Sequence, residues 1–223
     1  MPPVLVYLIP ENFIGPVFVF FDQKDGVVPE SDPLGQAVRV PENGVIKLSG
    51  SVDELLRSSR FELRPEAMVA VAKNGSRRVM KMFTGPHRGE NGGFWEGYID
   101  ERDQLHKFDV HYINTTKPTD EKPFYYLAEQ VMSERMVFLK DGCSHQAFVD
   151  HPEKIRSGEV DMDAVGVPSC GKFLIASPKE FLEMPDWLWR KPSNKLYKSI
   201  DEFVAEANER VSKKRALYSP GRP

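Results

Sequence analysis

The residue types most capable of chemistry gather between residues 143 and 170. Cys143, Ser144 and His145 are consecutive, His151 follows six residues later, and Cys170 lies further along the chain. Two sulfurs and two imidazoles are a ligand set that can hold zinc tetrahedrally. Known zinc fingers, however, have cysteines two to four residues apart and a close pair of histidines, and this chain has neither. The spacing therefore predicts a solvated loop and no metal site.

Nucleophilic catalysis is the second chemistry that this segment suggests. A Cys143 thiolate would need a histidine base within hydrogen-bond distance. His145 is two residues away, where side chains of an extended segment point to the same side. A free cysteine is more often a small buried hydrophobic residue. We expect Cys143 and Cys170 to be thiols without a chemical role, and we keep a hydrolase or metal-dependent enzyme built around Cys143 and His145 as the alternative function.

The same part of the chain is acidic. Residues 141–168 contain six acidic and two basic side chains, and from residue 159 to 167 the carboxylates alternate with apolar residues. Such a mixture suits a protein contact, because charge steers the encounter and apolar side chains hold the complex. The residues that we assign to this partner-binding contact are Glu159, Asp161, Met162, Asp163 and Val165.

No pattern in the chain indicates a cofactor. The glycine-rich segment 85–93 could be compared with a phosphate-binding loop. A phosphate-binding loop, however, continues into a helix through Lys and then Ser or Thr, because the helix amides hold the phosphates. Here a strand pattern follows instead. We therefore assign no catalytic residue and no cofactor.

Composition limits the partners further. The chain has 223 residues, 33 acidic against 30 Lys and Arg side chains and a formal net charge of −3, which argues against general affinity for nucleic acid. No Lys or Arg precedes Lys24, and Pro10, Glu11 and Asn12 interrupt the first apolar run, so no secretory signal is expected. No window approaches the roughly 20 apolar residues that a membrane helix needs. We expect a cytoplasmic protein that does not bind membranes.

The elements that must position these residues are predicted to be strands up to about residue 140. Val4 to Ile9 is apolar on both faces, as expected for a strand that is covered on both sides, and with residues 16–22 it is predicted to form an opening hairpin at a sheet edge. Asn43-Gly44 and Asn74-Gly75 between apolar runs predict two further hairpins. Further strands are expected at 36–40, 44–48, 61–63, 68–72, 77–83, 94–99, 107–113, 124–127 and 136–139, and one helical turn at 52–57.

Two helix starts follow the acidic segment. Ser177 with Glu180, and Ser199 with Glu202, have the spacing of a capping box. The second precedes a helix with one apolar face, made by Ile200, Phe203, Val204, Ala207 and Val211. The sequence thus predicts an α+β protein in which a mainly antiparallel, β-sandwich-like body (residues 1–140) carries an acidic loop and helices (residues 141–223), packed as one globular unit.

A resemblance can be added to this interpretation. Tyr7-Leu8-Ile9-Pro10, the run from Gly15 to Phe21 and Pro41-Glu42-Asn43-Gly44-Val45 resemble the start of an uncharacterised bacterial β-rich domain family. The resemblance covers about a third of the chain and implies a β-sandwich-like start without an activity. More loosely, the chain is similar in type to bacterial immunity proteins. The favoured function is therefore a non-enzymatic, protein-binding protein of the cytosol, such as an immunity protein that blocks the active site of a nuclease toxin.

Overall fold

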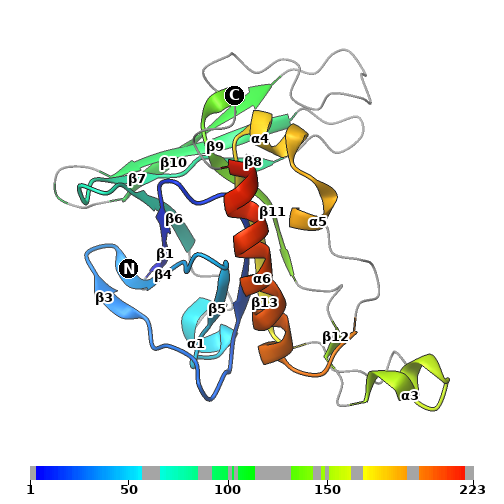
Figure 1. Cartoon of the computed structure of the whole chain (residues 1–223). Coiled ribbons are helices and arrows are strands. Elements are labelled where there is room, and N and C mark those ends of the chain that lie inside the picture. Colours follow the sequence, from blue (N-terminus) through cyan, green and yellow to red (C-terminus); the bar gives the residue numbers. More distant parts are fainter. Residues whose placement is uncertain are drawn as a thin grey trace.

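Two large β-sheets, a short two-stranded sheet and several helices make up the described structure (Figure 1). The computed structural model describes residues 4–56, 66–84, 92–99, 102, 105–113, 132–142, 147–148, 151–161, 168–189 and 196–218. The expected strands at 61–63 and 124–127 lie outside these ranges. Both large sheets are mixed, and six of the eleven pairings between described strands are antiparallel. The predicted α+β class is confirmed.

The first sheet has five strands with β1 (Val4–Pro10) at its centre. Its order is β3 (Glu30–Asp32), β4 (Gly35–Arg39), β1, β6 (Glu66–Val71) and β7 (Arg77–Val79), and β1 runs parallel to both neighbours. Both faces of β1 are buried, as its sequence predicts. Asp32 and Arg77, from the two outermost strands, form an ion pair of 3.0 Å between Oδ1 and Nη2. The sheet is therefore strongly curled, because its two edges approach each other.

The second sheet has seven strands, and one of its central strands comes from the C-terminal part of the chain. Its order is β10 (Leu105–Ile113), β9 (Gly92–Ile99), β8 (Met82–Thr84), β11 (Met136–Gly142), β13 (Cys170–Ala176), β2 (Gly15–Phe20) and β5 (Val45–Lys47). The sequence analysis did not predict β13, which pairs antiparallel with both β11 and β2. The residues after 141 therefore help to build the β body rather than only packing on it.

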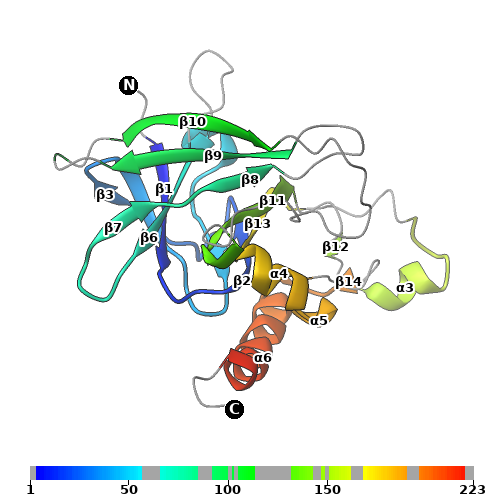
Figure 2. The same cartoon turned by 90° about the horizontal axis from the view of Figure 1, so that it is seen from above.

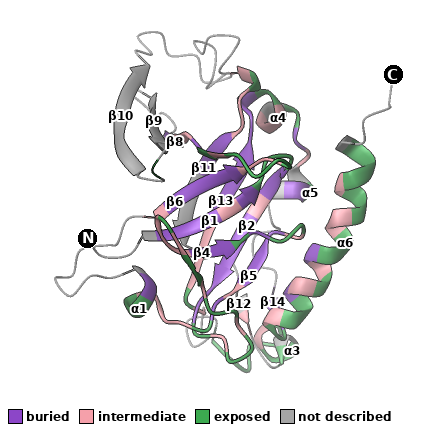
Figure 3. Cartoon of the chain, turned by 90° about the vertical axis from the view of Figure 1, so that its left-hand side faces the viewer, coloured by how far each residue is buried: buried purple, intermediate pink, exposed green. Residues whose placement is uncertain are grey.

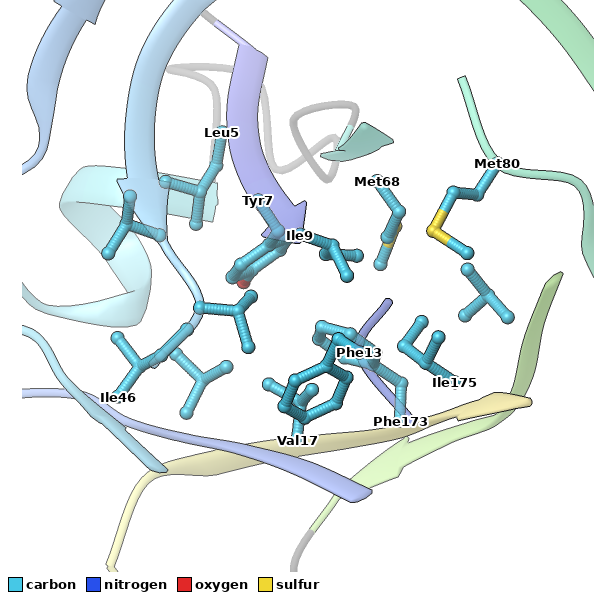
Figure 4. Packing of buried hydrophobic residues seen from close by; sticks show 14 of the residues in the cluster. Leu5, Tyr7, Ile9, Phe13, Val17, Ile46, Met68, Met80, Phe173 and Ile175 are labelled. Atoms are coloured by element: carbon cyan, nitrogen blue, oxygen red, sulfur yellow. The ribbon is translucent and has the colours of Figure 1, made fainter. Parts of the chain in front are cut away.

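The main core lies between the two sheets (Figure 4). Alternate residues of β1, Leu5, Tyr7 and Ile9, point into it from one side, and Phe173 and Ile175 of β13 point into it from the other. The rings of Tyr7 and Phe173 meet edge to face with centroids 5.3 Å apart. The Tyr7 hydroxyl donates a hydrogen bond of 2.9 Å to Oε1 of Glu66, and burial raises the pKa of Tyr7 well above its usual value.

The prediction of an opening hairpin is wrong. β1 and β2 lie in different sheets, and both edges of β1 are occupied by β4 and β6. The second half of the connection between them is buried, because Phe13 packs in the core between the sheets and Ile14 in the cluster beneath the helices, whereas Glu11 and Asn12 are exposed. The chain therefore crosses from one layer to the next at this point.

The two Asn-Gly turns differ in outcome. Asn74-Gly75 joins the antiparallel strands β6 and β7, so that predicted hairpin is confirmed. Asn43-Gly44 instead joins β4 to β5, which lie in different sheets, and the hairpin predicted there is wrong. Gly44 has a φ of +71°, and a Cβ on it would lie 2.2 Å from the Pro16 carbonyl oxygen. This crossing depends on a glycine for both reasons.

Helices α4 (Pro178–Glu183), α5 (Asp186–Trp189) and α6 (Ile200–Tyr218) cover the outer face of the seven-stranded sheet. The other described helices are α1 (Val52–Leu56), whose Leu55 packs in the core between the sheets, and α3 (Pro152–Arg156). The capping box of α4 is confirmed, and Ser199 accepts the Glu202 N–H at the start of α6. Phe203 and Ala207 of α6 are buried against Phe18 and Phe20 of β2. Figure 3 shows this inward stripe on α6 and its exposed outer side. No helix in the described part of the chain is long and apolar enough to cross a membrane.

Candidate functional site

The acidic segment of the sequence analysis, residues 141–168, includes a short helix at the periphery of the molecule. In Figures 1 and 2, α3 lies away from the two large sheets. The chain reaches it through β12 (Ala147–Phe148), which pairs in parallel with β14 (Leu196–Tyr197). Phe148 stacks on Tyr197 with centroids 5.5 Å apart and meets Phe20 edge to face at 5.7 Å. An aromatic anchor therefore fixes the chain shortly before the helix.

The end of α3 is a Schellman motif. The Gly158 N–H donates to the Ile155 carbonyl and the Glu159 N–H donates to the Lys154 carbonyl, the pairing that defines this motif. Gly158 has a φ of +79°, which favours glycine. The motif turns the chain back on α3. It thereby fixes the backbone at the first of the predicted contact residues.

The predicted partner-binding residues fall partly within the described structure. Glu159 and Asp161 are exposed, and Val160 between them has 39% of its surface exposed. Met162, Asp163 and Val165 lie outside the described residues. The pKa of the nearby Glu153 is lowered, mainly because its carboxylate accepts a hydrogen bond from its own backbone N–H. His151 makes a smaller contribution to this pKa in the same direction. Two exposed carboxylates thus flank an exposed apolar side chain.

The cysteine and histidine residues do not make a recognisable reaction centre where they are described. Cys170, at the start of β13, forms a disulfide, so the expectation of a free thiol at this position is wrong. Cys143 and His145 lie outside the described residues. His151 is exposed, with Nδ1 3.0 Å from Oε1 of Glu153. Among the residues that the structure describes, no group of three or more His, Cys, Asp or Glu side chains could hold a metal ion.

The structure also contains a groove that sequence reasoning did not find. It encloses about 840 Å³ where three parallel strands, β1, β4 and β6, reach their carboxyl ends at the same edge of the five-stranded sheet. The register aligns these ends, with Leu8 opposite Arg39 and Pro10 opposite Val71. The groove is lined by Leu8, Pro10, Glu11, Asn12, Arg39, Val40, Val71, Ala72, Lys73, Asn74, Ser76 and Arg135.

One wall of the groove is held by an ion pair. Arg135 donates two hydrogen bonds from Nε and Nη2 to the Glu180 carboxylate, and its Nη1 donates to the Glu11 carbonyl at 2.8 Å. Burial by itself would raise the pKa of Glu180. The hydrogen bonds from Arg135 and from the Ser177 backbone outweigh this effect and hold the pKa below its usual value. The positive charge of Arg135 is therefore neutralised by Glu180, and its side chain holds the Glu11 backbone in place at the wall of the groove.

Two other cations of the groove have no such partner. Arg39 at the end of β4 and Lys73 after β6 are exposed, and neither side chain forms a hydrogen bond or ion pair with any described residue. Both residues fall at the ends of strands that the sequence analysis did predict. The missing signal was parallel pairing, because only parallel strands bring these ends to one edge of the sheet.

Comparisons with known proteins add little to this description. No family model matches the chain, and no curated protein matches it. A solved structure that resembles it in part is the crystal structure named "Putative Lipoprotein from Bacillus anthracis". The alignment covers 54% of this chain and 76% of that one, with 14% sequence identity and a TM-score of 0.28. A likeness at this level supports no conclusion about fold or function.

Proposed function

We propose that the protein is a non-enzymatic binding protein whose ligand is another protein, and that α3 with the acidic residues after it forms the contact. The observation that supports this proposal is the peripheral position of α3 together with the exposed Val160 between Glu159 and Asp161. The contact would extend over Met162, Asp163 and Val165. In this arrangement the carboxylates would steer the encounter and the apolar side chains would hold the complex.

The proposed class of partner has a basic surface. A nuclease toxin presents cations for phosphate, so an immunity protein that offers carboxylates there would block its active site. No described residue favours the alternative of an enzyme centred on Cys143 and His145. Cys170, the second sulfur of that alternative, is already used in a disulfide and is not free to bind a metal.

Charge reversal tests the contact. The protein is used to isolate a stoichiometric protein partner from the cells that make it, and association rates are then measured for the wild type and for Glu159→Lys/Asp161→Lys. We expect association to slow by about tenfold and to lose much of its salt dependence, because rim charges act mainly on the association rate. Glu209→Lys, on the exposed side of α6, is the control and should leave the rate unchanged.

Two results would contradict the proposal. An isolated partner that associates equally fast with the reversed variant would place the contact elsewhere. A purified protein that turns over a substrate would contradict the non-enzymatic class.

The cytoplasmic location that the sequence predicts is part of the same proposal. The Cys170 disulfide bears on it, because disulfides are rare in a reducing cytosol. Binding is therefore measured with and without a thiol reductant. Binding that requires oxidised protein would place the contact in an oxidising compartment instead.

A further inference from the structure

The groove at the carboxyl ends of β1, β4 and β6 is independent of α3 and of the proposed protein contact. Its floor continues the apolar face of the five-stranded sheet that points away from the main core. Val6, Ala37, Ala67 and Val69 form a buried cluster on that face, and the partly buried Leu8 and Val71, packed on the cluster, also line the groove. A ligand in the groove would therefore rest on aliphatic side chains.

Donor groups surround this floor. Arg39 stands on the β4 side of β1 and Lys73 on the β6 side, each without a partner among the described residues. Asn74 accepts the Ser76 N–H through Oδ1 at 3.0 Å, which leaves its Nδ2 group as a further donor. Glu11 is the one carboxylate among the lining residues, and Arg135 is neutralised by Glu180. Arg39 and Lys73 together outweigh Glu11, so the net charge of the groove is positive.

The backbone of the groove is already hydrogen-bonded within the protein. Val40 N–H donates to the Leu8 carbonyl, Glu11 N–H to the Val71 carbonyl and Ala72 N–H to the Ser76 carbonyl, at 2.9 to 3.0 Å. An extended peptide that added itself as a strand would need such groups to be free. The volume, in contrast, lies within the range of small-molecule pockets, roughly 300 to 1,000 Å³.

We propose that this groove binds a small organic anion with an apolar body. The apolar part lies on Leu8 and Val71, and the anionic group lies between the Arg39 guanidinium and the Lys73 ammonium. A carboxylate, sulfonate or phosphate group fits this chemistry, because each accepts hydrogen bonds from both cations. An acidic peptide is a different occupant and is distinguished in the test.

A matched pair of dyes tests the proposal. 1-Anilinonaphthalene-8-sulfonate carries an anionic group, and N-phenyl-1-naphthylamine has the same apolar rings without it. Fluorescence titrations of folded wild-type protein should give a dissociation constant about tenfold lower for the sulfonate. In Arg39→Gln/Lys73→Met this preference should disappear, while the neutral dye binds as before. Lys179→Met/Lys213→Met removes the same charge from exposed positions on α4 and α6 and should change neither affinity.

A second variant separates groove binding from surface adsorption. Ala72→Trp places a ring in the groove and should abolish binding of both dyes, with circular dichroism confirming that the variant is folded. Equal affinity of the two dyes for the wild type, or an unchanged preference in Arg39→Gln/Lys73→Met, would overturn the proposal. Tighter binding of a hexaglutamate peptide than of the sulfonate, lost in the same double variant, would also overturn it in favour of an acidic peptide.

Discussion

Arg135 and Glu180 connect local capping with tertiary structure. Glu180 closes the capping box of α4 by accepting the Ser177 N–H at 2.8 Å, and the same carboxylate receives Arg135 from the segment before β11. Arg135 in turn donates to the Glu11 carbonyl beside the groove. A single carboxylate thus joins the start of a helix to the crossing between the two sheets.

Glu180→Gln should lower the free energy of unfolding by about 1 to 3 kcal/mol at pH 7, because hydrogen bonds to a charged group are lost. The pKa of Glu180 is lowered in the folded protein. Its stabilisation is therefore present above the unfolded pKa of about 4.3 and is lost as the pH falls through the lower folded pKa. Urea unfolding of both proteins over a range of pH should show their difference closing in acid.

The control for this measurement is Glu183→Gln, an exposed carboxylate of the same helix without a described partner. It should change the free energy of unfolding little at any pH. A difference between wild type and Glu180→Gln that stays constant down to acid pH would contradict the role of the carboxylate charge.

At the scale of elements, the two Asn-Gly turns have the same local sequence signal and different surroundings. Gly44 and Gly75 both have positive φ, at +71° and +85°. Space is open around Gly75, whereas the Pro16 carbonyl stands against Gly44.

Gly75→Ala should therefore cost only backbone strain, about 1 to 2 kcal/mol. Gly44→Ala adds overlap with a backbone oxygen and should cost about 2 to 5 kcal/mol. Urea unfolding measures both losses. Equal losses would show that Pro16 moves away without cost.

The docking of α6 is the second prediction at this scale. Phe203 is 1% exposed and meets Phe18 and Phe20 edge to face, with centroids 4.9 and 5.3 Å away. Phe203→Ala should cost about 3 to 5 kcal/mol of unfolding free energy. Leu217→Ala, at a position 43% exposed near the end of the same helix, should cost no more than about 0.5 kcal/mol. Similar losses for the two variants would mean that the apolar face of α6 contributes no more than its exposed end.

For the whole molecule, the disulfide of Cys170 is the covalent feature with the widest effect. Cys170 begins β13, the strand that joins the N-terminal strand β2 to β11 in one sheet. A cross-link at such a point restricts the unfolded chain more than the folded one.

Reduction should therefore lower the free energy of unfolding by about 2 to 4 kcal/mol. Cys170→Ser should show the same loss without reductant, and added reductant should then have no further effect. Thermal or urea unfolding with and without dithiothreitol makes the comparison. Wild-type stability that is indifferent to reductant would contradict a structural role for the bond.

Features that depend only on neighbouring residues could be predicted from the sequence. The capping box at Ser177, the apolar face of α6, the turn at Asn74-Gly75 and the two buried faces of β1 were all predicted, and the structure has them. Their signals are local, since caps, turns and periodicity are satisfied within a few residues of the chain.

The identity of neighbouring strands, in contrast, depends on the packing of the whole chain. The apolar run of β1 is compatible with a hairpin or with a central parallel strand, and only the arrival of β4 and β6 on its two edges selects the second. The groove exists for the same reason, because parallel pairing brings Arg39 and Lys73 to one edge of the sheet. β13 is a comparable case, in which a short apolar run acquires its two partners from segments far away in the sequence. The backbone groups that pair strands are the same in every residue, so the sequence does not specify which strands will pair. Pairing depends instead on which arrangement buries all the apolar faces together.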